Sequence, residues 1–352
     1  MVIMLLVLSS SRVYAQTDSS WHATPQLRIG GFIDVFYVYD FNQPEGNSRQ
    51  PYLFNHNRHN EVNLNAGIIQ VALEHPKYRA NLALQAGTYA MDNYAAEPPM
   101  LQHIYEANVG LALNQKNTLW LDAGIFESFI GFESVMSLDN LTLTRSLAAE
   151  NSPYYMTGAR LSYNVKKWHI SAWILNGWQR IQRVEGSVFP SVGTQVQFRP
   201  SEALTINLSS FAGTDNPDIT VAYRIFNNLY ADWKISRRFR VIGGFDYGIQ
   251  QNPGIGGSFR WYAPVLIAQF ALSERWKTAV RAEHYNDLQG LIITTEQGLG
   301  FRSSGFSWNV DYTPHPSIAC RMEARTIGAD GNLWQNMFVA ASVAVKLEHG
   351  FK

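Results

Sequence analysis

The stretch IACRMEAR, residues 318–325, decides the fold class because apolar and charged side chains alternate along it. Ile318, Cys320 and Met322 fall on one side of a strand with a period of two, and Arg321 and Glu323 fall on the other. The same period recurs in WHISAWI (168–174), WKTAVRAE (276–283) and FSWNVDY (306–312). The sequence therefore predicts many strands that each have one apolar face and one polar face.

Alternation alone does not distinguish a soluble sandwich from a membrane barrel, because both have strands with two unlike faces. The lengths of the connections do distinguish them. Every second connection is a short polar turn, and the intervening ones are mostly longer. The short turns fall near residues 75–77, 114–117, 165–167, 199–202, 236–238, 273–275 and 313–317, and the long links include 41–60, 90–102, 127–153 and 179–189. This asymmetry is typical of outer-membrane barrels, whose short turns face the periplasm.

We therefore predict an all-β fold, a transmembrane antiparallel β-barrel of about sixteen strands over residues 27–352, with short periplasmic turns and long extracellular loops. An even number of strands returns both termini to the periplasmic side. The predicted strands are 27–40, 61–74, 78–89, 103–113, 119–126, 154–164, 168–178, 190–199, 203–212, 219–233, 239–250, 258–272, 275–286, 296–313, 318–327 and 334–349.

The amino terminus reads as a secretory signal peptide, residues 1–15, followed by a periplasmic lead, residues 16–26. An apolar run from Val2 to Leu8 precedes small polar residues, and the pattern predicts cleavage after Ala15. A membrane-anchoring helix is the alternative, but it needs roughly 20 apolar residues and this run is shorter. We expect Sec-type export and residence in the outer membrane of a Gram-negative (diderm) bacterium.

Composition agrees with a body that contacts lipid. Aromatic residues make up 13% of the chain and charged residues only 16%, whereas soluble domains carry about 25% charged residues. Lys and Arg balance Asp and Glu at 28 each, so no basic excess points to nucleic acid. The single cysteine, Cys320, excludes an intramolecular disulfide framework.

Several segments carry a family resemblance. They are GGFIDVFY (30–37), LDAGIFE (121–127), Arg145-Ser146, TGARLSY (157–163), NVDYTP (309–314) and the alternating closing strand that ends near Phe351. In these segments the chain resembles the OmpL-like β-barrel porins over nearly the whole mature sequence. The resemblance implies an outer-membrane porin, and it supplies no catalytic residues.

The link at residues 127–153 is the third on the loop side, the position at which general porins fold a loop into the channel. We expect it to form a pore constriction loop with the charged residues Glu127, Glu133, Asp139, Arg145 and Glu150. The predicted pore-lining wall residues are Arg79, Asp122, Arg160, Lys277, Arg281, Glu283, Asp311, Arg321, Glu323 and Arg325.

Two interpretations of these charges remain open. An acidic inward loop that faces basic wall residues would set a transverse field and filter ions. Alternatively, the wall arginines pair with Asp122, Glu283, Asp311 and Glu323 and hold the barrel wall together. Because both signs line the lumen, the sequence predicts no preference for anions or cations.

The histidines of the first long link are candidates for metal binding. His56 and His59 could form a metal pair, but no cluster of cysteine or carboxylate ligands lies near them, and a polar loop is the simpler interpretation. We expect no enzyme activity, no cofactor and no metal. The expected partners are outer-membrane lipids, small hydrophilic solutes, the barrel-assembly machinery during insertion and further copies of the chain, for example in a trimer.

The leading functional prediction is a water-filled channel for passive diffusion of small hydrophilic solutes or ions. An alternative is a non-conducting barrel that acts as a surface-binding or structural protein. A third and more distant one is a barrel enzyme that acts on lipids.

Overall fold

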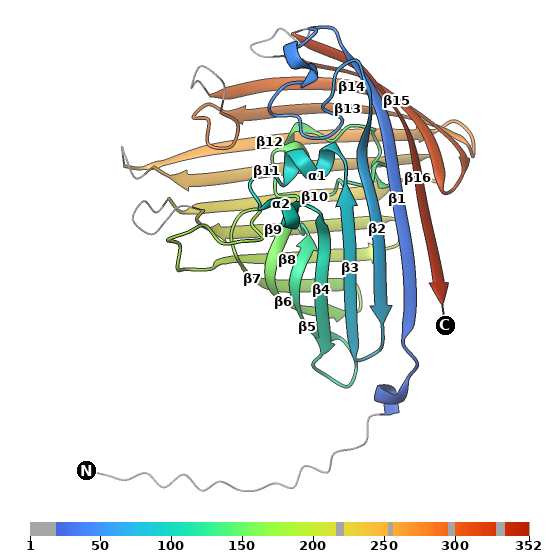
Figure 1. The fold of residues 1–352 in the computed structure, drawn as a ribbon, viewed down its shortest axis with the longest axis vertical. Coiled ribbons are helices and arrows are strands. Elements are labelled where there is room, and N and C mark those ends of the chain that lie inside the picture. The colour runs from blue at the N-terminus through green and yellow to red at the C-terminus, as the bar shows by residue number, and fades with distance from the viewer. Residues whose placement is uncertain (1–18, 216–221, 253–255, 295–299, 329–334, 352) are drawn as a thin grey trace, which may run out of the picture.

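The computed structural model describes residues 19–215, 222–252, 256–294, 300–328 and 335–351, and the predicted signal peptide, 1–15, lies outside these residues. The chain forms a closed barrel of sixteen antiparallel strands, in which each strand pairs with the next and β16 pairs with β1 (Figure 1). This confirms the predicted fold class. In the register of the closing pair, Val35 lies opposite Val343.

The strands are β1 Gln26–Asp40, β2 Val62–Glu74, β3 Tyr78–Ala86, β4 Ile104–Ala112, β5 Leu119–Glu127, β6 Tyr155–Val165, β7 Trp168–Leu175 and β8 Ser191–Ser201. The second half holds β9 Leu204–Gly213, β10 Arg224–Lys234, β11 Phe239–Gln251, β12 Ser258–Ala271, β13 Trp276–Asp287, β14 Phe301–His315, β15 Ile318–Gly328 and β16 Asn336–Phe351. Three short α-helices are α1 Thr88–Asn93, α2 Pro99–Gln102 and α3 Leu147–Glu150.

The period of two sorts side chains between the outer surface and the lumen. In β15, Cys320 and Met322 are exposed on the outer surface, whereas Arg321 and Glu323 are buried inside. Large apolar residues such as Ile69, Val109, Leu266 and Trp308 are similarly exposed on other strands, as expected for the outer face of a membrane barrel. Near the periplasmic end, the rings of Trp276 and Tyr312 lie 4.8 Å apart and fit an interfacial girdle.

Four predicted strands have bounds that differ from the structure by three residues or more. β7 stops at Leu175 and not at residue 178. β3 stops at Ala86 and not at residue 89, because Gly87 has φ +114° and the chain turns there into α1. β14 begins at Phe301 and not at residue 296, and residues 296–299 lie outside the described ranges. β10 begins at Arg224, and the predicted start at 219–221 also lies outside the described ranges.

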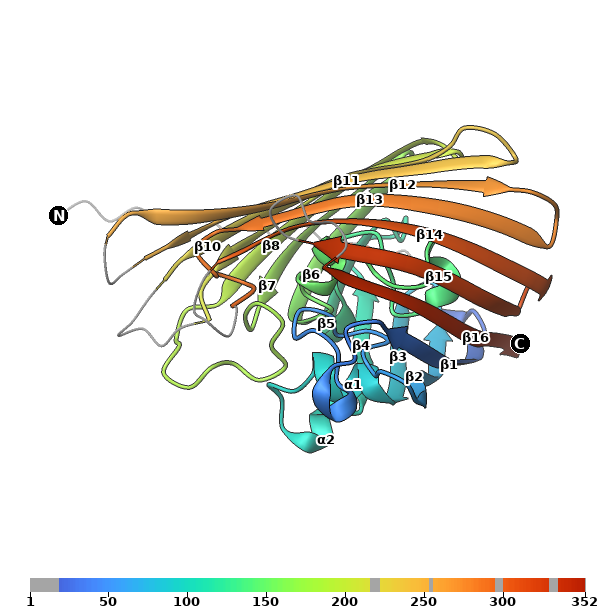
Figure 2. The same cartoon turned by 90° about the horizontal axis from the view of Figure 1, so that it is seen from above.

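Long links fold into the interior of the barrel, as the view from above shows (Figure 2). Buried apolar residues from several strands and from residues 128–154 form one contiguous cluster, which includes Phe36, Phe129, Leu143, Trp261 and Phe338. Within the described ranges, none of the helices combines the length and the apolar character that a membrane-spanning helix needs. Inward-folded segments therefore define what remains of the lumen.

Candidate functional site

The third long link, residues 128–154, is called loop 3 below, and it first crosses from β5 to the wall formed by β8–β11. The Phe129 carbonyl accepts hydrogen bonds from Ser209 Oγ at 2.8 Å and from Gln195 Nε2 at 3.3 Å. The backbone N–H of Gly131 donates to Asn228 Oδ1 at 3.1 Å. Inward polar side chains of the wall thus satisfy backbone groups of the loop that water would otherwise solvate.

Two wall glycines make room for aromatic side chains of loop 3. A Cβ at Gly193 on β8 would lie 2.5 Å from Phe129 Cζ, and a Cβ at Gly244 on β11 would lie 2.6 Å from Phe132 Cε1. Phe129 also stacks on Trp173, with ring centroids 4.7 Å apart. Inward glycine positions therefore fix where the loop packs against this wall.

Loop 3 then runs to the wall formed by β13–β15. Arg321 forms an ion pair with Asp311 at 2.8 Å and donates hydrogen bonds to the carbonyls of Ser137 and Asn140. The backbone N–H of Leu143 donates to Asn309 Oδ1 at 3.0 Å. These side chains hold residues 137–143 of the loop against β14 and β15.

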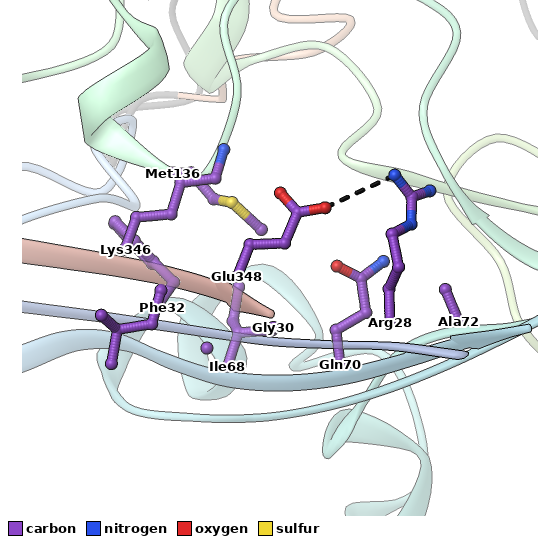
Figure 3. Close-up of a pocket in the computed structure, with 11 residues that line it drawn as sticks. Arg28, Gly30, Phe32, Ile68, Gln70, Ala72, Met136, Lys346 and Glu348 are labelled. Atoms are coloured by element: carbon purple, nitrogen blue, oxygen red, sulfur yellow. Dashed lines mark hydrogen bonds and ion pairs between the residues drawn. The ribbon is translucent and has the colours of Figure 1, made fainter. Parts of the chain in front are cut away.

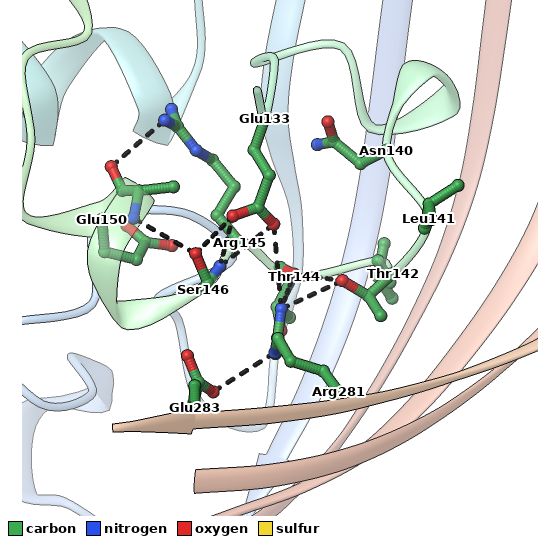
Figure 4. Close-up of polar contacts among 12 residues, drawn as sticks. Glu133, Asn140, Leu141, Thr142, Thr144, Arg145, Ser146, Glu150, Arg281 and Glu283 are labelled. Carbon is green, nitrogen blue, oxygen red and sulfur yellow. Dashed lines mark hydrogen bonds and ion pairs between the residues drawn. The ribbon is translucent and has the colours of Figure 1, made fainter. Parts of the chain in front are cut away.

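A buried polar network fixes the middle of loop 3 (Figure 4). Glu323 Oε2 accepts from the Thr144 backbone N–H at 2.6 Å and from Thr144 Oγ1 at 2.9 Å. Arg281 donates to the Thr144 carbonyl at 2.6 Å and to Glu323 Oε1 at 2.8 Å. Arg325 donates to the Arg145 carbonyl at 2.9 Å and pairs with Glu283 at 2.7 Å, and Glu283 Oε2 accepts from the Leu147 N–H at 2.6 Å.

The charges of this network nearly balance. Arg281 and Arg325 are opposed by Glu283 and Glu323 on the wall and by Glu133 on the loop, so the carboxylates exceed the guanidinium groups by one. Burial raises the pKa of Glu133 above its ordinary value, although Arg281 at 3.9 Å and hydrogen bonds from Ser146 act in the opposite direction. Glu133, the carboxyl group that loop 3 contributes to this network, therefore holds its proton more tightly than a glutamate in water.

The end of loop 3 docks on the first long link. Ser146 Oγ accepts a hydrogen bond from the Ala149 N–H and caps α3. Glu150 Oε2 then accepts from the backbone N–H groups of Phe54 at 2.9 Å and Asn55 at 3.2 Å, and from the Tyr154 hydroxyl at 2.8 Å. Two inward loops are thus joined by one buried carboxylate.

The remaining loop residues of the prediction make their own contacts. Arg145 lies over the Tyr154 ring, 4.2 Å from its centroid, and donates to the Ala149 carbonyl. Asp139 is exposed and pairs with Lys346 on β16 at 2.8 Å. Glu127 is the last residue of β5 and not a loop residue, and it accepts a hydrogen bond from the Tyr105 hydroxyl. Glu127, Glu133 and Arg145 nevertheless line one small cavity of about 40 Å³, so three of the five predicted charges lie together.

The predicted wall residues all lie on strand faces that point inward, but they form distinct groups. One group is the network around Arg281 already described. A second consists of Arg79 and Arg160, which both pair with the fully buried Asp122 at 2.6 Å and 3.1 Å. Lys277 lies on β13 opposite Asp311 in the strand register, near the periplasmic end.

Cavities lie beside loop 3 and near the extracellular ends of the strands. On the periplasmic side, a cavity of about 550 Å³ is bounded by Leu138–Leu141 of the loop and by wall residues that include Lys277 and Arg321. On the extracellular side, a cavity of about 580 Å³ is lined by Tyr52 and Phe301 among others. A smaller cavity of about 150 Å³ opens where Met136 of the loop faces Gln70 and the Arg28–Glu348 ion pair (Figure 3).

Several contact residues of loop 3 were missed by sequence reasoning. They are the polar residues Asn228 and Ser209 and the glycines Gly193 and Gly244. Each lies on the inward face of its strand, so strand parity could have found them as lumen residues. The inward loop 41–61, which carries His56 and His59, was also missed. His56 Nε2 lies 2.9 Å from Asp34 Oδ2, and His59 Nδ1 accepts from the Asp40 N–H.

Comparison with solved structures supports this architecture. The channel DcaP of Acinetobacter baumannii superposes with a TM-score of 0.63 at 9% identity, over 92% of this chain and 97% of that one. An anion-selective porin from Comamonas acidovorans gives 0.58 at 11% identity, over 93% and 100%. A variant of OmpT from Vibrio cholerae that lacks its loop L8 gives 0.57 at 7% identity, over 92% and 99%.

At these identities the similarity concerns the fold, and no curated protein sequence matches the chain. The sequence itself matches a family model over residues 26–344, which is nearly the whole barrel. That family is described as "Putative beta-barrel porin-2, OmpL-like". The closed barrel, its inward loops and this match agree, and the chain belongs to the OmpL-like β-barrel porins of the Gram-negative outer membrane.

Proposed function

We propose that this porin lets small hydrophilic solutes cross the outer membrane passively, and that loop 3 sets the width of the passage. The observation that carries the proposal is the anchoring of loop 3 to both walls, through Asn228 on β10 and through Glu323 and Arg281 on β15 and β13. A loop held in this way obstructs part of the barrel cross-section. The size of a passing solute then depends on the space that the loop leaves.

Passage requires water and polar side chains along the route. The periplasmic cavity beneath loop 3 is lined by charged groups, among them Arg240, Lys277 and Asp311. Such a surface stabilises hydrated polar solutes more than apolar ones. This favours a channel for hydrophilic solutes over a route for lipids, and it gives no support to lipid-directed catalysis.

Planar-bilayer recording of the purified protein tests the proposal. We expect stepwise conductance from the wild-type chain and larger steps when residues 138–145 are replaced by two glycines. A matched control shortens residues 183–188 of another long link, where Glu185 and Val188 are exposed, and should leave the step size unchanged. Equal steps from the wild type and the loop 3 variant would contradict the role of loop 3.

A second function is favoured by one observation. The apolar cluster that includes Phe36, Phe129, Leu143 and Trp261 spans the interior between opposite walls. A barrel that is closed by this cluster would serve as a surface-binding or structural protein. That function predicts a silent wild-type chain and a conducting loop 3 variant in the same recordings.

The porin context also suggests partners. The alternating closing strand β16, which ends at Phe351, is the element that the barrel-assembly machinery would read during insertion. Lipids of the outer membrane would contact the exposed apolar residues of the outer face. Assembly into a homo-oligomer such as a trimer is part of this proposal, and crosslinking in native membranes would test it.

A further inference from the structure

The ion-pair group on β3, β5 and β6 is unusual because two arginines share one aspartate. Arg79 donates to Asp122 Oδ1 through Nε at 2.6 Å and to Oδ2 through Nη2 at 2.7 Å. Arg160 also approaches Oδ2, with Nε at 3.2 Å and Nη2 at 3.1 Å. The carboxylate is therefore shared by two guanidinium groups, and the group carries one positive charge in excess.

The excess charge faces the lumen. The Asp122 side chain is 0% exposed, whereas the side chains of Arg79 and Arg160 are 35% and 23% exposed. Neither Nη1 atom takes part in the contacts with Asp122. The acid is hidden beneath two partly exposed cations, so a solute in the lumen meets guanidinium groups and not the carboxylate.

The surrounding wall holds the two arginines in place. The Arg79 guanidinium lies 4.3 Å from the Trp120 ring centroid, and the Arg160 guanidinium lies 4.9 Å from that of Phe126 and 5.0 Å from that of Trp173. Cation–π contacts of this kind orient the planar group and leave its edge free for hydrogen bonds. The two guanidinium groups are therefore preorganised by aromatic platforms.

An inward glycine on the intervening strand completes the site. A Cβ at Gly110 on β4 would come too close to Asp122 Oδ1 and would lie 3.1 Å from Arg79 Nε. Only a residue without a side chain lets the ion pair lie flat across β4. The ion pair therefore fills a recess in the wall, and no side chain of β4 covers it at this point.

Neighbouring charges leave the excess in place. Glu106 is also inward on β4 and acts on Arg160, but it is bound by Asn81 and Gln70. Its effect on Arg160 is smaller than the effects of Asp122 and Arg79. Towards the periplasm, Arg199 adds a basic group to the same wall.

We propose that Arg79 and Arg160, seated on Asp122, form a binding station in the lumen for small oxyanions, namely carboxylates or phosphates. Guanidinium groups match the geometry of both anions through paired N–H donors. The inference rests on the proposed channel function and gives it a solute class, because an anion that enters the lumen would pause at this station. The same argument predicts that the open channel prefers anions.

Binding can be tested without any conductance. Trp120 and Trp173 lie beneath the two guanidinium groups, so tryptophan fluorescence of the folded protein in detergent reports on the site. Titrations at constant ionic strength use sodium phosphate in one arm and sodium succinate in the other. We expect saturable changes in at least one arm, and the stronger arm distinguishes phosphate from carboxylate. A wild-type signal that does not saturate in either arm would overturn the proposal.

Three variants should change the affinity for the anion in different ways. The double variant Arg79→Gln with Arg160→Gln should weaken binding by about tenfold or more, as expected for the loss of charge-assisted hydrogen bonds. Asp122→Asn removes the buried negative charge and should tighten binding. The control Arg58→Gln removes a guanidinium that is 16% exposed and paired with its own aspartate, Asp92, and should leave binding unchanged.

Folding is checked by the resistance of each barrel to unfolding in cold detergent. If Asp122→Asn does not fold, the single variant Arg160→Gln replaces it, because it leaves a neutral Arg79–Asp122 pair and should abolish the excess charge. Equal weakening by Arg58→Gln and by the double variant would show a general charge effect and would contradict a defined station.

Ion selectivity separates this inference from the channel proposal. In bilayers with a salt gradient, we expect a reversal potential that indicates anion preference in the wild type and a shift towards cations in the double variant. Conductance without saturable anion binding would leave the porin function standing and refute the station. Saturable anion binding by a barrel that does not conduct would support the station and refute the porin function.

Discussion

Glu323 on β15 accepts two hydrogen bonds from Thr144, one from its backbone N–H at 2.6 Å and one from its hydroxyl at 2.9 Å. A wall carboxylate thus holds the middle of a loop that begins after β5. The same carboxylate pairs with Arg281 at 2.8 Å, so the contact between wall and loop is part of a buried ionic network.

Removal of the Glu323 charge should destabilise the folded barrel. We expect Glu323→Gln to lower the free energy of unfolding by about 3 kcal/mol, because one member of a buried ionic network then lacks its partner. Urea unfolding in detergent micelles measures the change. Glu348→Gln is the matched control, because Glu348 pairs with Arg28 but is 59% exposed, and it should change stability by less than about 0.5 kcal/mol.

Removal of the Glu133 charge should not destabilise the folded barrel, and its effect on stability should depend on pH. Burial raises its pKa, so the folded state binds this proton more tightly than the unfolded state. The contribution of the group to stability is fully present below the unfolded pKa, about 4.5, and is lost as pH rises through the folded pKa. We therefore expect Glu133→Gln to be at least as stable as the wild type at pH 7, with no difference below pH 4.5. Melting temperatures measured across this pH range provide the test, and a less stable variant at pH 7 would contradict the assignment.

Two adjacent glycines on β11 offer a steric test of loop 3 packing. Gly244→Ala should destabilise the barrel by about 1–3 kcal/mol, because the new Cβ would lie 2.6 Å from Phe132 Cε1. Gly243→Ala is the control, since its Cβ would meet nothing nearer than Leu266 Cδ1 at 3.9 Å. If both substitutions had the same effect, the backbone preference of glycine and not the socket for Phe132 would explain the loss.

Hydrogen exchange should reveal the link between the two inward loops. Glu150→Ala removes the acceptor of the Phe54 and Asn55 amide protons. We expect exchange of these amides to accelerate by about tenfold or more, since a hydrogen bond to a charged group contributes roughly 1.5–3 kcal/mol. The amide of Leu143 bonds to Asn309 and should keep its protection, unless the whole of loop 3 is released.

The strands could be predicted from the sequence because the signal that defines them is local. Alternation in residues 318–325 fixes which side chains of β15 face outward, and the closed barrel needs only neighbouring strands to pair in order. The end of β3 was predicted too late because the positive φ of Gly87 depends on backbone geometry that composition does not reveal.

The candidate site could be predicted only in part, because its contacts join residues that are distant along the chain. The sequence identifies Arg281 and Glu323 as inward residues, but their shared partner Thr144 lies far away in a loop without periodicity. The alternative in which wall charges pair with one another describes Arg79, Arg160 and Asp122. Their unequal exposure, which leaves a positive surface, is visible only in three dimensions.

The hydrogen bonds to Thr144 also determine how the loop can change during evolution. A segment that is attached at both ends and again in its middle behaves as two short bridges, and each bridge can lengthen or shorten at a modest entropic cost while the other stays in register. Insertions in residues 135–136 would then alter the half of the passage beside Met136, while Glu133 keeps its contact with Ser146 in the other half. Relatives of this porin could acquire new solute ranges by editing one bridge, as long as the attachment at Glu323 is retained.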